Sequence, residues 1–398
     1  MSRLRTAPPR TRVFAVLAAL ALLTACTSAG ARANPTWVPA QTPSAVQLPT
    51  EVPPDSGGGG GGQSPGPPPS GGQPGPSPSG PAVDPFVVAS KLSAPTGIAV
   101  LGDGTALVGE RTTGRLLIVA PVAGQPVRVA KTLTGLDTRG GGLLDIALSA
   151  TYVEDGLVFA LITTATDTRL VHFTLTGPVT PLLTGIPRGE SDNTGKLLVL
   201  GNGDVLVGTG DAGQPTLAAD PKSLAGKVLR VDDLGKPAGG NPSAGSAVFT
   251  SGHRTVDGLC VDAKRSAILA TEAGRTDELN RLTAGASYGW PNGNGTAGQS
   301  LPRTIGGVGG CAVIDDNLYV TGLSGKDVFQ ATLGASGTVG TFTGMLDKRY
   351  GRIDNVAAAS DGTLWLTTSN KDGKGSPVAA DERVLHIRPS GGGGSSSA

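Results

Sequence analysis

The stretch Ser191–Gly213, SDNTGKLLVLGNGDVLVGTGDAG, joins a polar segment to two apolar runs that flank Asn202-Gly203. Apolar runs separated in this way predict a β-hairpin. The polar segment before it contains Asp192, whose carboxylate could accept a proton from a substrate. A carboxylate is ordinarily a weaker base than imidazole, but burial can raise its pKa. Asp192 is therefore a candidate general base.

Three further acidic residues, Asp211, Glu272 and Asp277, stand near turns between apolar runs. Hard oxygen ligands of this kind suit calcium. Asp and Glu in turns also accept hydrogen bonds from backbone N–H groups, which would make their role structural. The sequence leaves both interpretations open for these three residues.

The elements that must position these side chains are short apolar runs joined by turns rich in Gly, Asp and Asn. The unit of run, turn and run recurs six times, roughly 45 to 60 residues apart. This predicts an all-β fold, a six-bladed β-propeller over residues 86–389, with ligand chemistry in the central channel. Two β-sandwiches are the alternative, but they give no reason for the self-similarity. The six copies start at Pro95, Gly141, Thr194, Val256, Val308 and Ile353.

Cys260 and Cys311 occupy matching positions, each shortly after a Gly at the start of an apolar run. This predicts that they lie close together on the inner strands of adjacent blades. A disulfide between them requires an oxidising compartment. The alternative is a pair of buried thiols that pack as small apolar side chains.

Residues 1–25 have the features of a bacterial lipoprotein signal peptide. Arginines precede the apolar segment 13–23, which is short for a transmembrane helix. The segment ends in LTAC, which resembles a lipobox, so Cys26 is the expected site of acylation. An ordinary signal peptide with a chance cysteine is the alternative. Acylation would anchor the protein in the cell envelope, on the outer face of the cytoplasmic membrane.

Pro, Gly and Ser dominate residues 26–85, so this segment is expected to be a disordered tether that follows the lipidated cysteine. Residues 390–398 are expected to be a disordered tail. The chain has 32 Lys and Arg against 31 Asp and Glu, a balance that argues against nucleic acid as a partner. A lipid membrane, a small polar ligand and another envelope protein are the partners that this composition allows.

Four stretches resemble the glucose/sorbosone dehydrogenase family, the soluble sugar dehydrogenases that use pyrroloquinoline quinone (PQQ). They are GGLLDIALS, TGDAGQPTLAADPKSLAGKVLRVDDLGKPAGGNP, SGHRTVDGLCVD and TEAGRTDELNRLTAGASYGWP, and the resemblance covers residues 95–388. In the family, a histidine takes the proton of a sugar hydroxyl while hydride passes to the quinone. The family motif H-N-G-G-R-L matches DNTGKL, so Asp192 stands at the position of that histidine. His172, His253 and His386 offer no evident replacement.

The resemblance also implies which residues would hold the quinone and its calcium. Arg254 and Arg352 keep the family's residue type, whereas five other positions differ. A lost Lys, a lost Arg and two added Asp would make the pocket about four charge units more negative than that of the family, which disfavours a trianionic quinone. The altered positions are Gly140 and Ala273 for glutamines, Thr255 for an asparagine, Ser324 for a lysine (with Lys326 two residues away) and Asp354 for an arginine.

Two features of the family would survive these changes. The backbone carbonyls of Gly274 and Arg275 match those that hold calcium, and a different side chain does not remove a carbonyl. Trp290, in YGWP, could line a ligand face, although a structural corner is the alternative.

Three functions are consistent with the sequence. The first is a binding or scaffold module with a degenerate quinone site, in which Asp192 lies near Arg254 and Arg352 and Asp354 completes an ion-pair cluster. The second is a PQQ- and calcium-dependent sugar or alcohol dehydrogenase with Asp192 as base. The third is a calcium-dependent propeller lactonase or hydrolase. The binding or scaffold hypothesis predicts that PQQ binds poorly and does not decide whether calcium binds.

Overall fold

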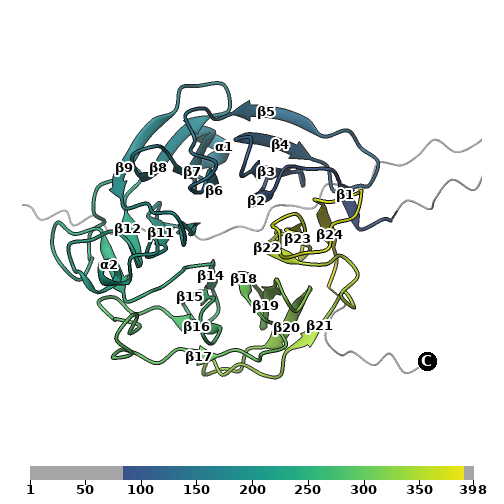
Figure 1. Cartoon of the computed structure of the whole chain (residues 1–398). Coiled ribbons are helices and arrows are strands. Elements are labelled where there is room, and N and C mark those ends of the chain that lie inside the picture. The colour runs from purple at the N-terminus through teal and green to yellow at the C-terminus, as the bar shows by residue number, and fades with distance from the viewer. Residues whose placement is uncertain (1–83, 390–398) are drawn as a thin grey trace, which may run out of the picture. The chain divides into compact units, whose positions relative to one another are not determined.

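A computed structural model describes residues 84–389, which form six four-stranded antiparallel sheets arranged as the blades of a β-propeller (Figure 1). The first blade consists of β2 (Pro95–Val100), β3 (Ala106–Glu110), β4 (Arg115–Val119) and β5 (Arg128–Thr132). The second consists of β6 (Leu143–Leu148), β7 (Leu157–Thr163), β8 (Thr168–Thr174) and β9 (Thr180–Ile186). The third consists of β10 (Gly195–Val199), β11 (Val205–Thr209), β12 (Lys227–Val231) and β13 (Val248–Ser251). The next two are β14 (Gly258–Asp262), β15 (Ala267–Glu272), β16 (Glu278–Arg281) and β17 (Gln299–Ser300); and β18 (Val308–Ile314), β19 (Asn317–Gly322), β20 (Asp327–Thr332) and β21 (Thr343–Gly344). Two short helices, α1 (Tyr152–Asp155) and α2 (Pro215–Ala219), lie in loops.

The sixth blade closes the ring with a strand from the other end of the folded segment. It contains β22 (Ile353–Ala358), β23 (Leu364–Thr368), β24 (Val384–Ile387) and, at its outer edge, β1 (Val87–Ala89). The strand β1 pairs antiparallel with β24, so the first and last strands are bonded to each other. The six-bladed propeller predicted from the sequence is therefore confirmed.

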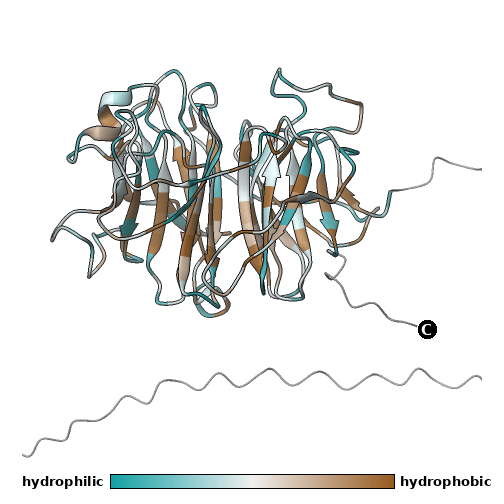
Figure 2. Ribbon diagram, turned by 90° about the horizontal axis from the view of Figure 1, so that it is seen from below, coloured by the Kyte–Doolittle hydropathy of each residue, from teal (hydrophilic) through white to brown (hydrophobic). Residues whose placement is uncertain are grey.

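The core of the propeller consists of six apolar clusters, each between two neighbouring blades. Between the fourth and fifth blades, for example, Leu269 of β15 packs in one cluster with Val320 of β19. Apolar residues accordingly run along the strands, and hydrophilic ones gather in the loops (Figure 2). A single blade cannot bury both of its faces, so the closed ring is the stable unit.

The innermost strands β2, β6, β10, β14, β18 and β22 surround the central channel. The hairpin predicted around Asn202-Gly203 is β10–β11, paired from Gly195 with Thr209 to Val199 with Val205. Cys260 of β14 and Cys311 of β18 form a disulfide between adjacent inner strands, with Cα atoms 5.8 Å apart.

The folded part extends to Asp84, which the sequence assigned to the tether. Its Oδ2 accepts a hydrogen bond from the Tyr350 hydroxyl at 2.9 Å and lies 3.0 Å from Arg349 Nη2. The signal peptide, Cys26, the tail and nearly all of the tether lie outside the described residues. Within residues 84–389, no helix is long and apolar enough to cross a membrane.

Candidate functional site

A cavity of about 320 Å³, here named the mouth cavity, lies at one end of the central channel. It forms where the inner strands begin and the second strands of the blades end, because antiparallel pairing places these two ends side by side. Its lining residues are Thr96, Arg111, Leu144, Thr194, Gly195, Lys196, Val256, Asp257, Val308, Gly309, Leu323, Arg352, Asp354, Ser369, Asp372 and Lys374.

The mouth cavity contains charged side chains of both signs. Four basic residues face three acidic ones, which gives a formal charge of +1. From the sequence, only Arg352 and Asp354 were expected at the site. The cavity is therefore nearly balanced, with a slight positive excess. The basic residues are Arg111, Lys196, Arg352 and Lys374, and the acidic ones are Asp257, Asp354 and Asp372.

Asp192 and Arg254 form an ion pair beside this cavity. Asp192 Oδ2 lies 3.7 Å from Arg254 Nη2, and both side chains are partly exposed. The backbone of Asp192 has a φ of 52°, a left-handed conformation that Asp adopts more readily than most residues. The Arg254 guanidinium lies over the Trp290 ring, 5.6 Å from its centroid, and the Trp290 indole donates to Asp211 at 2.8 Å. Trp290 is thus packed against the ion pair.

Arg352 pairs with Asp372. Its Nε donates to Asp372 Oδ2 at 2.9 Å, and its Nη2 lies 2.7 Å from the same oxygen. Among the described residues it forms no ion pair with Asp192 or Asp354, so the predicted cluster is wrong in this half. In a regular strand, residues two apart such as Arg352 and Asp354 would point to the same side. That rule does not hold here, because the pairing of β22 with β23 shifts register between Ile353 and Asn355. Arg352 and Asp354 nevertheless both line the mouth cavity.

Asp257 lines the mouth cavity and is hydrogen-bonded to Thr255, which does not line it. Thr255 Oγ1 lies 2.7 Å from Asp257 Oδ2 and 2.9 Å from the carbonyl oxygen of Ala273. The Ala273 N–H donates to the same carboxylate oxygen at 2.8 Å. Burial raises the pKa of Asp257 to about 6, against the opposing effect of these hydrogen bonds. Asp257 therefore changes its charge near pH 6.

Comparison with known proteins shows to which family this chain belongs. The sequence profile named Glucose / Sorbosone dehydrogenase matches residues 92–302. The chain belongs to this family. Its fold is similar to that of the PQQ-bound aldose sugar dehydrogenase of Streptomyces coelicolor, with a TM-score of 0.71 and 33% identity over 77% of this chain and 97% of that one.

Two curated relatives match a smaller share of their own length. An uncharacterised protein of Synechocystis is 30% identical over 53% of this chain and 60% of its own. The quinoprotein glucose dehydrogenase B of Acinetobacter calcoaceticus is 26% identical over 52% of each chain. This chain thus spans only about half to three fifths of these relatives.

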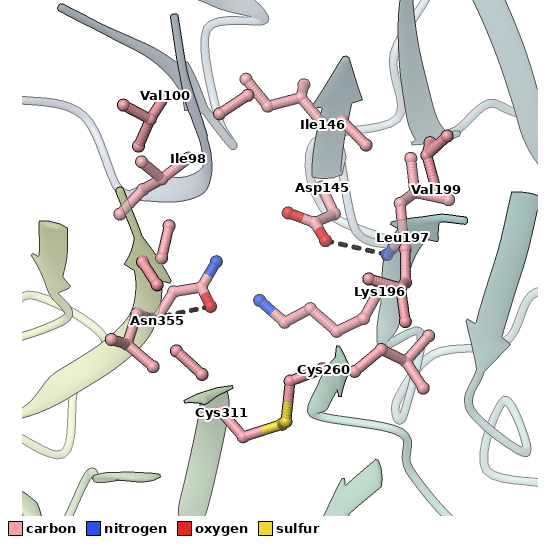
Figure 3. A pocket seen from close by; sticks show the side chains of 18 of the residues that line it. Ile98, Val100, Asp145, Ile146, Lys196, Leu197, Val199, Cys260, Cys311 and Asn355 are labelled. Atoms are coloured by element: carbon pink, nitrogen blue, oxygen red, sulfur yellow. Dashed lines mark hydrogen bonds between the residues drawn. A yellow bond between two sulfur atoms is a disulfide. The ribbon is translucent and has the colours of Figure 1, made fainter. Parts of the chain in front are cut away.

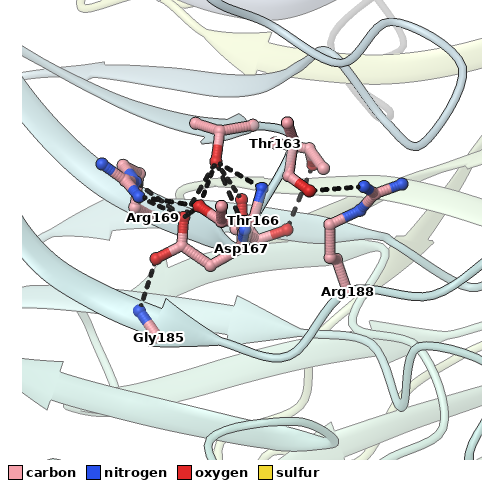
Figure 4. Close-up of polar contacts among 9 residues, drawn as sticks. Thr163, Thr166, Asp167, Arg169, Gly185 and Arg188 are labelled. Carbon is pink, nitrogen blue, oxygen red and sulfur yellow. Dashed lines mark hydrogen bonds and ion pairs between the residues drawn. The ribbon is translucent and has the colours of Figure 1, made fainter.

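The glutamine that the family resemblance assigns to position 140 has no free space in this member. A Cβ on Gly140 would lie 2.5 Å from Arg188 Nη2 and 2.9 Å from Asp137 Oδ2. Arg188 and Asp137 form an ion pair of 2.6 Å. Arg188 also donates to the carbonyl of Ala165 at 3.0 Å (Figure 4). A longer side chain at position 140 would have to displace this pair.

Other family positions lie away from the mouth cavity. Ser324 and Lys326 are exposed and do not line it, whereas their neighbour Leu323 does. Gly274 and Arg275 are exposed in the loop after β15 and do not line it either. None of these four residues therefore lines the mouth cavity, so the carbonyls of Gly274 and Arg275 lie outside its lining as well.

The acidic residues considered as calcium ligands have other partners. Asp277 Oδ2 accepts the N–H groups of Gly307 and Val308, and Glu272 accepts from Asn280 and lies 2.5 Å from His253 Nδ1. In residues 84–389, no group of three or more His, Cys, Asp or Glu side chains is arranged to hold a metal ion. The structural interpretation is thus favoured for these carboxylates, and the lactonase hypothesis gains no support from them.

Five charged residues of the mouth cavity were missed at the sequence level: Arg111, Lys196, Asp257, Asp372 and Lys374. Lys196 and Asp257 lie inside the motifs DNTGKL and GHRTVDGL, so their positions could have been found there. The other three follow the second strands of their blades, and no local motif marks them.

Proposed function

We propose that the mouth cavity binds a small hydroxylated molecule with a single anionic group, such as a sugar acid, and that the protein does not oxidise sugars with PQQ. The formal charge of +1 in the cavity carries this proposal. One excess cation balances one carboxylate, whereas PQQ has three. Ligand hydroxyls would find acceptors at Asp257 and Asp354 and hydroxyl partners at Thr194 and Ser369.

The residues present do not fit PQQ. Arg352 is engaged by Asp372, and Arg254 by Asp192. At position 140, where the family resemblance implies a glutamine, a longer side chain would have to displace the ends of the Arg188 and Asp137 side chains. A tricarboxylate would have to break these ion pairs and would then approach uncompensated aspartates, at a cost in electrostatic free energy.

A PQQ- and calcium-dependent dehydrogenase with Asp192 as base is the second candidate. Family membership favours it, as does the similarity to a structure that contains PQQ. Against it, the carboxylate at the position of the proton-accepting histidine is paired with Arg254. A calcium-dependent lactonase has less support, because Asp277 accepts backbone N–H groups and Glu272 lies 2.5 Å from His253 Nδ1.

Calorimetric titration of the full chain with gluconate and with glucose tests the proposal. Gluconate should bind and glucose should bind about tenfold more weakly, because only gluconate has the carboxylate. Lys374→Ala should weaken gluconate binding and leave glucose binding unchanged. Lys222→Ala, at an exposed lysine outside the cavity, is the matched control. Equal affinities for gluconate and glucose would refute a site for an anion.

We further propose that acylated Cys26 anchors the protein to the outer face of the cytoplasmic membrane. LTAC at the end of a short apolar segment supports this. The segment of residues 26–83 would then tether the propeller to the envelope, where a small polar ligand or another envelope protein can reach it.

A further inference from the structure

A second cavity, here named the channel cavity, occupies the channel beyond the mouth cavity. Its volume is about 370 Å³, within the range of small-molecule sites. All six innermost strands line it, and the two cavities share one residue, Lys196 (Figure 3). Because the inner strands begin at the mouth, their later residues carry the channel cavity toward the opposite face.

The channel cavity is polar at one end and apolar along its length. Its polar side chains are Asp145, Lys196 and Asn355, which point into it from β6, β10 and β22 (Figure 3). Each is the first residue that its strand contributes, so all three lie toward the mouth. The later residues of these strands, 146–148, 197–199 and 356–358, are all Ile, Val, Leu or Ala.

The polar end has unused hydrogen-bonding capacity. Among the described residues, the ammonium of Lys196 has no hydrogen bond and no ion pair, although the residue is half-buried. Asp145 is 5% exposed, and its Oδ2 accepts the Leu197 N–H at 2.9 Å. Asn355 is also buried and uses one amide N–H on the Thr96 carbonyl at 2.7 Å, which leaves its second N–H.

These three side chains favour a ligand with an anionic head group over a ligand with a cationic one. A half-buried ammonium group that has no hydrogen-bond or ion-pair partner is stabilised by a nearby anion. Burial raises the pKa of Asp145, and Asp354 acts in the same direction while Lys196 opposes it. In its neutral form Asp145 donates a hydrogen bond to a carboxylate, and the spare Asn355 N–H can do the same.

We infer that the channel cavity is a second ligand site, which takes an amphipathic monocarboxylate with its head at Lys196, Asp145 and Asn355 and its aliphatic chain along the apolar walls toward the opposite face. The inference does not depend on the proposed function of the mouth cavity. Only Lys196 is common to both sites, so each site can be altered alone.

Calorimetry of the full chain with octanoate, 1-octanol and octylamine tests this inference. Octanoate should bind, and the alcohol and the amine should bind about tenfold more weakly or not at all, because neither supplies an anion. Lys196→Met should weaken octanoate binding by about tenfold or more. Absence of octanoate binding, or equal affinity for octylamine, would overturn the inference.

Two variants separate the cavities. Ala358 is exposed and lines only the channel cavity, so Ala358→Phe should obstruct octanoate without disturbing the core or gluconate binding. Lys374→Ala, in the mouth cavity alone, should leave octanoate binding unchanged. If Ala358→Phe leaves octanoate affinity intact, the fatty acid binds outside the channel cavity and the inference is wrong.

Discussion

The family resemblance places Asp192 at the position of a proton-accepting histidine, and in this protein Asp192 forms an ion pair with Arg254. Its left-handed backbone is also accessible to histidine, so the position can accept the family's residue without new strain. On our proposal, the surrounding pairs, Arg352 with Asp372 and Arg188 with Asp137, oppose sugar oxidation more than any one side chain does.

Asp192→His should consequently not create a sugar dehydrogenase. Dye reduction with an aldose, PQQ and calcium should stay at the background of the wild type, because the variant gains a base but no quinone site and leaves Arg254 without its partner. Asp192→Asn serves as the control that removes the charge without adding a base. Turnover by the histidine variant alone would show that the base was the missing part.

Asp257 should make the protein less stable as pH rises from about 4 to 6. Its folded-state pKa of about 6 lies above the ordinary value, so the folded state binds more protons than the unfolded state in this window. The loss amounts to about 1 to 2 kcal/mol, less than the full shift implies because the carboxyl partly faces the open cavity.

Asp257→Asn should flatten this part of the pH profile and stabilise the protein at pH 7. Urea denaturation at pH 4, 5, 6 and 7 measures the difference. Asp233→Asn, at an exposed aspartate outside the mouth cavity, is the control and should keep the wild-type slope. A parallel shift of the Asp257→Asn curve at all four pH values would contradict this assignment.

At the scale of elements, the disulfide between β14 and β18 joins two blades through their inner strands. It closes a loop with a sequence separation of 51, so its loss should cost about 2–4 kcal/mol of unfolding free energy. The double variant Cys260→Ala, Cys311→Ala measures this by urea denaturation. Reduced wild type should match the double variant; a large remaining difference would indicate a packing effect.

The elements were predictable where a local pattern specifies them. The β10–β11 hairpin follows from two apolar runs around Asn202-Gly203, and the six repeats predict the six blades. The pairing of Arg352 was not predictable, because Asp372 lies 20 residues away in a loop after another strand and a register shift interrupts β22. The proximity of the Arg188 side chain to Gly140 was not predictable either, because it is a contact between distant loops that no sequence motif reveals.

For the whole molecule, the described propeller follows a Pro-, Gly- and Ser-rich segment that begins at a candidate lipidation site. Cys26→Ala should move the protein from the membrane fraction to the aqueous fraction, because acylation is the expected anchor. Fractionation with immunodetection measures this, and Cys260→Ala is the control for loss of a cysteine. Equal partitioning of wild type and Cys26→Ala would exclude this anchor.

The ring as a whole brings seven charged residues to one mouth, and their balance is the central claim about function. Titration of the full chain with PQQ in the presence of calcium, followed by absorbance and calorimetry, tests it most directly. The charge balance and the engaged arginines lead us to expect no saturable binding at micromolar PQQ. Micromolar binding accompanied by dye reduction with any aldose would contradict the account and establish the dehydrogenase.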